Sequence, residues 1–258
     1  MPALPIHRFC GRDGASLAYR ELGEGRTVVL IHGFLSTATV QWILPGHAAA
    51  VAAQGRRVVM PDLRGHGDSA RPHDAAAYPS DVVTDDAFAL IEQLGLTDYD
   101  LGGYSLGGRT TVRMLVRGAT PGRAIVAGMG LNGVARTARR ERGDAFRRVV
   151  ANFGTIEPGS PGWEAQAFMQ RIGADPVALG HILGQSLDTP PEALARITTP
   201  TLVAMGADDD PADAEALATA LPHSRCEIVP GDHVTAASAP QLGAAITAFL
   251  TTTAPPRR

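Results

Sequence analysis

Four glycines surround a single serine in the stretch Gly-Gly-Tyr-Ser-Leu-Gly-Gly at residues 102–108. A glycine inside a regular element costs about 0.5–1 kcal/mol relative to alanine, so this density indicates a backbone that other residues cannot adopt. Residues 103–107 fit the pattern Gly-x-Ser-x-Gly, with an apolar segment before it and a helix-like segment after it. That pattern marks a very tight strand-to-helix turn that projects the serine hydroxyl clear of a sheet. The chain is therefore expected to pass directly from a strand into a helix at Ser105.

Short apolar runs alternate with helix-like segments along the rest of the chain. Strands covered on both faces read as continuous apolar runs, and their alternation with helices is typical of a mainly parallel sheet. Residues 7–22 instead predict an antiparallel hairpin with its turn at residues 11–14. The other strands are predicted at residues 27–32, 57–62, 99–105, 123–130, 200–207 and 225–231. The sequence thus predicts an α/β fold with a mostly parallel, twisted sheet flanked by helices.

Helices are predicted at residues 80–94, 106–118 and 235–251, and the segment at residues 132–198 lies between the last two. Ser80 and Asp81 are expected to cap the first of these helices, and Gly95 to end it. The terminal helix is amphipathic, with Leu242, Ile246, Phe249 and Leu250 on one face. Residues 132–198 break the strand–helix rhythm and predict a helical insertion, so the core is expected to comprise residues 1–131 and 199–258.

Composition limits the partners and the compartment. The chain has 258 residues, a hydrophobic content of 45% and a net charge of −3, which gives no argument for nucleic acid or membrane as a partner. All 23 basic residues are arginine, a bias that indicates a GC-rich, bacterial genome. Two distant cysteines and an amino terminus without a signal-like pattern favour the cytoplasm. We expect a small-molecule substrate and leave open whether the protein is a monomer or a homodimer.

A serine hydroxyl needs a base, held by an acid, to become a nucleophile. In Gly-x-Ser-x-Gly enzymes the acid and then the histidine follow the serine in the chain. His233, after the last predicted strand, can reach the carboxyl edge of the sheet, whereas His223 enters that strand from the opposite side. Asp209, in the loop after the strand at 200–207, is the favoured acid, and Asp208 is the alternative.

The segment Ile-His-Gly-Phe at residues 31–34 ends the first predicted parallel strand. Such an ending can aim the next backbone N–H at a developing oxyanion, so the amides of Phe34 and Leu106 are the predicted oxyanion hole. His32 is then expected to be a structural hydrogen-bonding residue.

These motifs together resemble those of the α/β-hydrolase-fold serine hydrolases, over about residues 12–250. The family's oxyanion loop is similar to residues 32–34, and its Asp-x-Arg-Gly-x-Gly-x-Ser loop to residues 62–69. The acid and histidine loops are similar to residues 200–210 and 230–233. The resemblance implies that residues 132–198 cap the active site and that residues 62–69 form a structural loop. Asp232 departs from the family, in which a small residue commonly precedes the histidine.

Substrate contacts are predicted from position alone. Phe34 and Tyr104 flank the oxyanion hole and the nucleophile, and Trp42 follows the oxyanion strand. Arg109 lies one turn into the helix after Ser105, and Trp163 and Phe168 lie in the insertion. The arginine-rich run at residues 136–148 could steer an anionic substrate, although such a run is usually a solvated face.

The function expected from these residues is cleavage of a small carboxylic ester, or a lactone or thioester, through an acyl-enzyme on Ser105, with no metal or organic cofactor. A serine at this position argues against the epoxide hydrolases and haloalkane dehalogenases of the same fold, which use an aspartate. Carbon–carbon bond hydrolases remain an alternative, as does a lyase similar to SHCHC synthase that would bind its substrate through Arg136, Arg139 and Arg140. A ligand receptor or signalling protein with little turnover is the alternative from another class.

Overall fold

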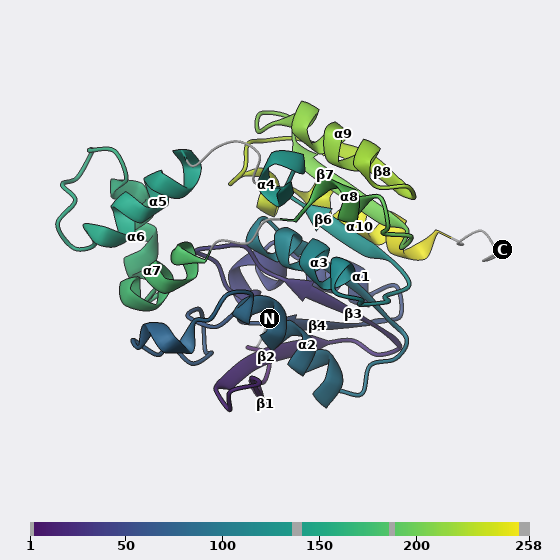
Figure 1. Cartoon of the computed structure of the whole chain (residues 1–258), viewed down its shortest axis with the longest axis horizontal. Coiled ribbons are helices and arrows are strands. Elements are labelled where there is room, and N and C mark those ends of the chain that lie inside the picture. Colours follow the sequence, from purple (N-terminus) through teal and green to yellow (C-terminus); the bar gives the residue numbers. More distant parts are fainter. Residues whose placement is uncertain (1–2, 136–140, 186–188, 253–258) are drawn as a thin grey trace.

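A twisted sheet between two layers of helices forms the centre of the molecule (Figure 1). The computed structural model describes residues 3–135, 141–185 and 189–252. Within them the sheet has eight strands in the order β1-β2-β4-β3-β5-β6-β7-β8. The strands are β1 (His7–Cys10), β2 (Ser16–Leu22), β3 (Arg26–Ile31), β4 (Arg56–Pro61), β5 (Tyr99–Tyr104), β6 (Ala124–Ala127), β7 (Thr201–Gly206) and β8 (Ser224–Val229). The hairpin β1–β2 is antiparallel, β2 pairs antiparallel with β4, and the remaining strands are parallel.

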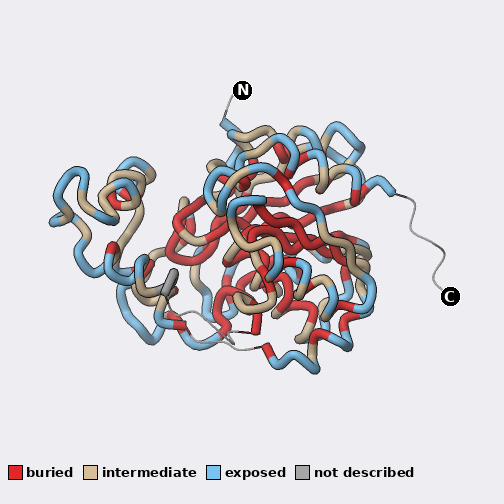
Figure 2. Tube along the Cα trace, turned by 90° about the horizontal axis from the view of Figure 1, so that it is seen from above, coloured by how far each residue is buried: buried red, intermediate tan, exposed pale blue. Residues whose placement is uncertain are grey.

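Helices cover both faces because successive strand residues point to opposite sides. Val28 and Leu30 of β3 pack under α1 and α10, whereas Val29 and Ile31 pack on the other face with α2 and α3. The core helices are α1 (His47–Ala52), α2 (Val82–Gln93), α3 (Leu106–Val116), α9 (Pro211–Ala220) and α10 (Pro240–Thr251). Both faces of the central strands are buried, as the continuous apolar runs predicted (Figure 2). The predicted α/β-hydrolase fold class is confirmed.

Among the described residues, five further helices lie between β6 and β7, and they divide into two groups. They are α4 (Leu131–Ala135), α5 (Glu141–Ala151), α6 (Trp163–Arg171), α7 (Pro176–Gly184) and α8 (Pro191–Leu194). Helices α5, α6 and α7 stand together to one side of the sheet (Figure 1). The other two helices pack in the core with α9, through Val134 of α4, Leu194 of α8 and Ile197 just after it. The cap at residues 132–198 stays a prediction, but both ends of that segment contribute to the core.

Two helix starts differ from the prediction. The terminal helix begins at Pro240 rather than at residue 235, because a separate helical turn occupies Ala236–Ser238 and proline suits a first helical position. The N-cap residue of α2 is Asp81, with a φ of 68°, and its side chain makes no capping bond. Its carboxylate instead accepts hydrogen bonds from Thr84, Arg113 and Arg117. An ion-pair cluster with α3 has therefore replaced the expected cap.

None of the helices in the described part of the chain is long and apolar enough to span a lipid bilayer.

Candidate active site

Ser105 occupies the sharp turn between β5 and α3. Its backbone has φ 53° and ψ −111°, a region that residues other than glycine rarely adopt. A Cβ on Gly103 would lie 2.3 Å from the carbonyl carbon of Gly107, and one on Gly107 would lie 2.1 Å from the Ile31 carbonyl oxygen. Side chains at both positions are thus excluded by backbone atoms, which explains the two motif glycines.

The other two glycines of the stretch have separate reasons. Gly102 pairs in register with Ile125 of β6, and a Cβ there would lie 2.7 Å from the Ile125 Cβ. A Cβ on Gly108 would lie 3.1 Å from the Ala127 carbonyl oxygen, so this glycine lets α3 approach β6 closely. Both contacts cross to a neighbouring strand, which no local motif reveals.

The structure brings the three predicted triad residues together. Nε2 of His233 lies 3.0 Å from Oγ of Ser105, and Nδ1 of His233 lies 2.7 Å from Oδ2 of Asp209. An ionised carboxylate only accepts hydrogen bonds, so Nδ1 carries the ring proton and Nε2 is free to accept the proton of the serine hydroxyl. The Asp209 side chain is 2% exposed and that of His233 is 22% exposed, so the acid is shielded while the imidazole reaches the surface. This arrangement can activate a nucleophile.

The neighbouring acids of the β7–α9 loop have other roles. Asp208 is exposed, and its backbone N–H donates to the carbonyl of Gly231. Asp210 is the N-cap of α9, where its carboxylate accepts the N–H of Asp213 ahead of Pro211. The structure therefore places Asp209, and not Asp208, against the imidazole. His223 precedes β8, at the opposite edge of the sheet from the triad.

The predicted oxyanion donors lie in the loop after β3, which carries Phe34, and at the start of α3, which begins with Leu106. Gly33 packs against the nucleophile, since a Cβ on it would lie 3.3 Å from the Ser105 Cβ. Leu106 is the first residue of α3, so its N–H has no acceptor inside the helix. Leu35 has a φ of 56°, a strained value that marks the tight bend of this loop beside Phe34. Gly33, which precedes Phe34, and Leu106 thus both adjoin Ser105, and the role of the two amides as an oxyanion hole stays a prediction.

His32 orients the peptide that carries the Phe34 amide. Its Nε2 accepts the N–H of Leu63 at 2.9 Å, so the neutral ring carries its proton on Nδ1, which donates to the Gly33 carbonyl at 2.7 Å. Burial lowers the pKa of His32 and so favours the neutral ring, while the two hydrogen bonds select this tautomer. In a trans peptide the C=O and the next N–H point in opposite directions. Holding the Gly33 carbonyl therefore also sets the direction of the Phe34 N–H, and His32 has the structural role expected of it.

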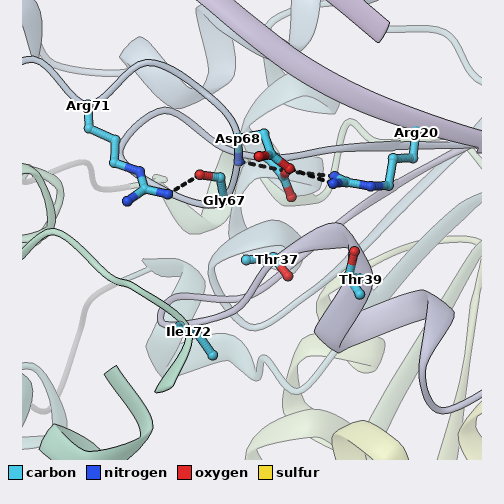
Figure 3. Close-up of a pocket in the computed structure, with 8 residues that line it drawn as sticks. Arg20, Thr37, Thr39, Gly67, Asp68, Arg71 and Ile172 are labelled. Carbon is cyan, nitrogen blue, oxygen red and sulfur yellow. Dashed lines mark hydrogen bonds and ion pairs between the residues drawn. The ribbon is translucent and has the colours of Figure 1, made fainter. Parts of the chain in front are cut away.

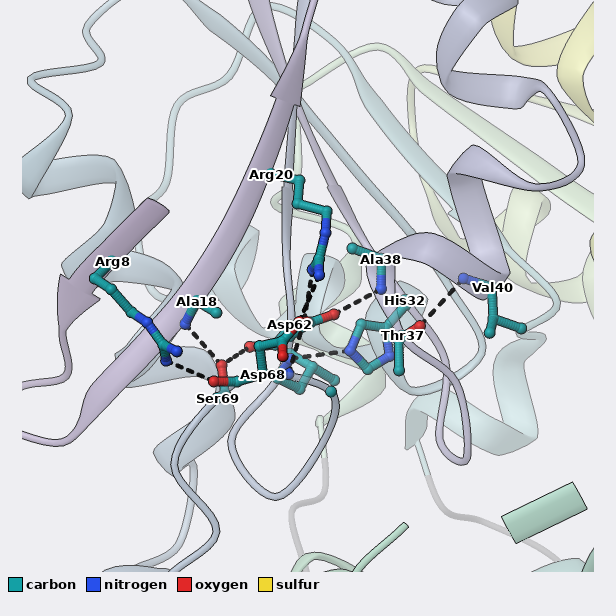
Figure 4. Close-up of polar contacts among 12 residues, drawn as sticks. Arg8, Ala18, Arg20, His32, Thr37, Ala38, Val40, Asp62, Asp68 and Ser69 are labelled. Carbon is teal, nitrogen blue, oxygen red and sulfur yellow. Dashed lines mark hydrogen bonds and ion pairs between the residues drawn. The ribbon is translucent and has the colours of Figure 1, made fainter. Parts of the chain in front are cut away.

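Residues 62–69 tie this loop to the sheet (Figure 4). The buried carboxylate of Asp62 accepts the N–H of Ala38 at 2.8 Å and a guanidinium N–H of Arg20 at 3.0 Å. Ser69 accepts the N–H of Ala18 in β2 and donates to the Asp62 carbonyl. These bonds connect Ala38, in the segment after Phe34, to β2 through residues 62–69. They agree with the structural role that the resemblance implied.

A small polar pocket of about 190 Å³ opens beside that network (Figure 3). It is lined by Arg20, Thr37, Thr39, Asp62, Gly67, Asp68, Arg71 and Ile172. Its two guanidinium groups are already engaged, Arg20 with carboxylates and Arg71 with the carbonyls of Gly67 and Gly173. None of these lining residues belongs to the triad or carries a predicted oxyanion donor.

Two of the predicted substrate contacts have other surroundings. Trp42 has no exposed surface and packs in the core with Val28 and Ala48, so the ring is closed off from any ligand. Tyr104 is 3% exposed, and its hydroxyl donates to the backbone carbonyl of His233 at 2.7 Å. The side chain of Tyr104 points along the sheet edge to the histidine loop. Neither side chain offers exposed surface to a ligand in this structure, and substrate contact by Trp42 and Tyr104 stays a prediction.

The remaining predicted contacts lie nearer the surface. Phe34 and Phe168 are half-buried and belong to one apolar cluster with Leu35 and Met169, which joins the oxyanion loop to α6. Trp163 is half-buried at the start of α6 and is outside that cluster. Arg109 is half-buried in α3, one turn after Ser105. For Phe34, Phe168, Trp163 and Arg109, substrate contact stays a prediction.

The arginine-rich run is only partly described. Arg136, Arg139 and Arg140 lie outside the described residues. Arg147 and Arg148 of α5 are exposed, and Arg147 pairs with Asp144, as on a solvated helix face. Phe146 in the same run lies with its ring 5.4 Å from that of Phe34, edge to face. Phe146 is not among the predicted substrate contacts, although an aromatic residue inside a charged run is a signal for one.

Asp232 organises the turn that carries the histidine. Its Oδ1 accepts the backbone N–H groups of Val234 and Thr235 and the Thr235 hydroxyl, at 2.7–2.9 Å. These hydrogen bonds to Thr235 and Val234 lower the pKa of the exposed Asp232 carboxyl. The acid that departs from the family pattern is thus engaged with its own turn. Within the described residues, no group of three or more histidine, cysteine, aspartate or glutamate side chains could hold a metal ion.

Comparison with known proteins identifies the fold family. A family model described as alpha/beta hydrolase fold matches residues 26–156, about half of the chain. A non-heme chloroperoxidase of Kitasatospora aureofaciens is 37% identical over 114 residues, 42% of this chain and 38% of that protein. A non-heme haloperoxidase of Rhodococcus erythropolis is 26% identical over 254 residues, 85% of this chain and 89% of that protein.

The solved structures show the same fold at lower identity. A thermophilic esterase from Thermogutta terrifontis superimposes with a TM-score of 0.76 at 24% identity, covering 95% of this chain and 98% of the esterase. In four curated relatives, the chloroperoxidase among them, the match spans only 28% to 40% of the relative's length. These likenesses establish the fold and the family, and they leave the substrate open.

Proposed function

This chain belongs to the α/β hydrolase fold family, and from that premise we propose that it is a serine hydrolase that cleaves a small carboxylic ester, lactone or thioester. One observation carries the proposal: an unbroken line of hydrogen bonds runs from Asp209 through His233 to the hydroxyl of Ser105. Such a line activates a hydroxyl that is otherwise a weak nucleophile at neutral pH.

The reaction proceeds in two halves on Ser105. Oγ attacks the ester carbonyl carbon while His233 Nε2 takes the hydroxyl proton, and the tetrahedral intermediate collapses when His233 protonates the departing alkoxide or thiolate. Water then attacks the acyl-enzyme with His233 again as base, which releases the carboxylic acid and restores the serine. Asp209 stabilises the imidazolium in both halves without taking its proton.

The negative charge that develops on the substrate oxygen needs donors placed in advance. The amides of Phe34 and Leu106 supply them in this proposal, and the loss of one such donor typically costs about 10²–10³ in kcat. Leu106 also opens α3, whose amino-terminal end favours negative charge. His32 supports the arrangement because it holds the peptide that carries the Phe34 N–H.

The described surroundings favour an apolar substrate group. Phe34 follows Gly33, which packs against Ser105, and its ring meets that of Phe146 of α5 edge to face; both rings are half-buried. Such a surface gains free energy when an alkyl or aryl group covers it. We therefore expect short alkyl and aryl esters to be better substrates than charged ones.

Ester hydrolysis and covalent labelling test the proposal together. Wild-type protein should hydrolyse p-nitrophenyl acetate and butyrate and should be labelled by a fluorophosphonate probe, whereas Ser105→Ala should do neither. Ser224→Ala is a matched control, because Ser224 begins β8 and lies at the far edge of the sheet. Wild-type protein that is folded yet neither labelled nor hydrolytic would refute the proposal and favour a receptor or signalling protein.

A second candidate rests on the relatives. Two of them are named as haloperoxidases, so peroxide-dependent oxidation of bromide is a candidate activity of this chain as well. Bromide oxidation at a higher kcat/KM than ester hydrolysis would favour it. Cleavage of vinylogous diketones with poor ester turnover would favour a carbon–carbon bond hydrolase, and a lyase would release a product from an acidic substrate without adding water.

A further inference from the structure

The base of the candidate triad lies on a segment without regular secondary structure. His233 falls in the turn between β8 and the helical turn at Ala236–Ser238, and its neighbour Val234 is 75% exposed. Exposed turns are mobile, whereas a catalytic base has to stay within hydrogen-bonding reach of its nucleophile. A displacement of about 1 Å at a reacting group can lower the rate by roughly 10²-fold. Something other than the strand ladder therefore has to hold this residue.

Tyr104 makes a direct bond to that backbone. Its hydroxyl donates to the carbonyl oxygen of His233 at 2.7 Å, and the two rings lie 5.6 Å apart at an angle of 51°. Tyr104 is the last residue of β5, immediately before Ser105. One side chain thus joins the strand that ends in the nucleophile to the backbone of the base.

The phenol ring is itself held rigidly, which an anchor requires. Tyr104 is 3% exposed and packs in the core with Ala127, Ala236 and Trp42. A Cβ on Gly128 would lie 2.6 Å from the ring carbon that bears the hydroxyl, so the absence of a side chain there makes room for the ring. The ring cannot swing away without disturbing β6 or the helical turn after His233.

We propose that Tyr104 is a positioning residue whose hydroxyl holds the His233 backbone so that the imidazole stays within reach of Ser105. This role rests on the proposed function, in which His233 moves the serine proton. Tyr104 touches neither substrate nor proton in it, and it acts through the histidine loop. A role of this kind affects the transition state more than substrate binding, so kcat falls while KM is retained.

Tyr104→Phe is the test variant, because it removes only the hydroxyl. Tyr78→Phe is the matched control, since Tyr78 is also buried and its hydroxyl has no hydrogen-bond partner among the described residues. We expect Tyr104→Phe to lower kcat for p-nitrophenyl acetate about tenfold, the equivalent of one hydrogen bond of typical net strength, with KM unchanged. Tyr78→Phe should retain wild-type kcat and KM.

A second measurement does not depend on turnover. The proton that His233 Nδ1 donates to Asp209 should give a low-field NMR signal, which Tyr104→Phe should shift or broaden and Tyr78→Phe should leave in place. If Tyr104→Phe keeps both kcat and this signal, even with a lower melting temperature, the tyrosine is merely structural and the inference is overturned. If wild-type protein hydrolyses no ester, the proposed function fails, and the NMR comparison alone decides whether Tyr104 positions His233.

Discussion

Replacing Gly107 by alanine tests whether crowding at the serine turn accounts for the glycines. A Cβ there would lie 2.1 Å from the carbonyl oxygen of Ile31, 2.6 Å from its carbonyl carbon and 2.8 Å from the carbonyl oxygen of His32. Ordinary contacts begin at 3.4 Å, and all three atoms belong to the backbone of β3 and its continuation. No side chain can rotate out of the way, so α3 has to move from the sheet by about 1 Å.

The expected loss of stability follows from that displacement. Overpacking of this kind typically costs about 1–3 kcal/mol. Alanine is favoured over glycine inside a helix by about 1 kcal/mol. The net loss in the free energy of unfolding is therefore the cost of overpacking minus this helix-propensity gain. For a chain of this size each kcal/mol shifts the melting temperature by about 2–4 °C. The net loss is then about 0–2 kcal/mol, and the Gly107→Ala melting temperature is expected to lie up to about 8 °C below wild type.

The same substitution should also lower the catalytic rate, and by a large factor. Gly107 is two residues from Ser105 and adjoins Leu106, so the nucleophile and an oxyanion donor move with α3. A displacement of this size should lower kcat/KM for p-nitrophenyl acetate by about 10²-fold or more. Thermal unfolding followed by circular dichroism, and initial rates below the transition, measure the two effects separately.

Gly184→Ala is the matched control. Gly184 ends α7, and a Cβ there would meet nothing within 4 Å. Alanine should leave activity unchanged there and raise stability by at most about 1 kcal/mol. If Gly107→Ala were as stable and as active as Gly184→Ala, steric exclusion at the serine turn could not be the reason for the glycine.

Three further outcomes are expected. Asp209→Asn should lower kcat about 10⁴-fold with the fold intact, because the amide favours the wrong tautomer of the imidazole. Asp208→Asn should retain wild-type kcat, and equal effects of the two substitutions would contradict the assignment of the acid. Burial lowers the pKa of His66 from 6.5 to about 3, so between these values the unfolded chain binds a proton that the folded chain does not. The free energy of unfolding should therefore fall as the pH drops below 6.5, by up to about 1.4 kcal/mol per pH unit from this group, and urea titrations should show a shallower dependence in His66→Gln. Asp232→Ala should lower kcat a few-fold because the turn around the histidine loses its acceptor, whereas Asp232→Asn keeps an oxygen there and should match wild type in the same ester assay; a loss in both would point to the charge instead.

Local patterns predicted most of the fold. The apolar runs located all the parallel strands to within a few residues, because a strand buried on both faces has to be apolar throughout. The turn at Ser105 was equally predictable, because the Gly-x-Ser-x-Gly pattern lies in five consecutive residues, and the close approach of Gly103 to Gly107 falls within it. The loops that carry Asp209 and His233 followed from the rule that parallel strands present their carboxyl ends at one edge of the sheet.

Contacts between distant segments could not be predicted in this way. Asp208 and Asp209 are adjacent in one turn, and only the position of the His233 ring distinguishes the shielded acid from the exposed one. Trp42 was expected at a pocket and lies in the core, because the helices on its face of the sheet close over it.

The sequence by itself thus determined the α/β architecture, the turn at Ser105 and the loops that carry the acid and the histidine. Only the tertiary structure decided that Gly102 lies beside Ile125 of the neighbouring strand. The same holds for the bond from the Tyr104 hydroxyl to the His233 carbonyl. Periodicity and turn chemistry arise between covalent neighbours and are therefore written in short stretches of sequence. The direction of a side chain in a loop, and the partner it meets, depend on how elements far apart in the chain pack against each other.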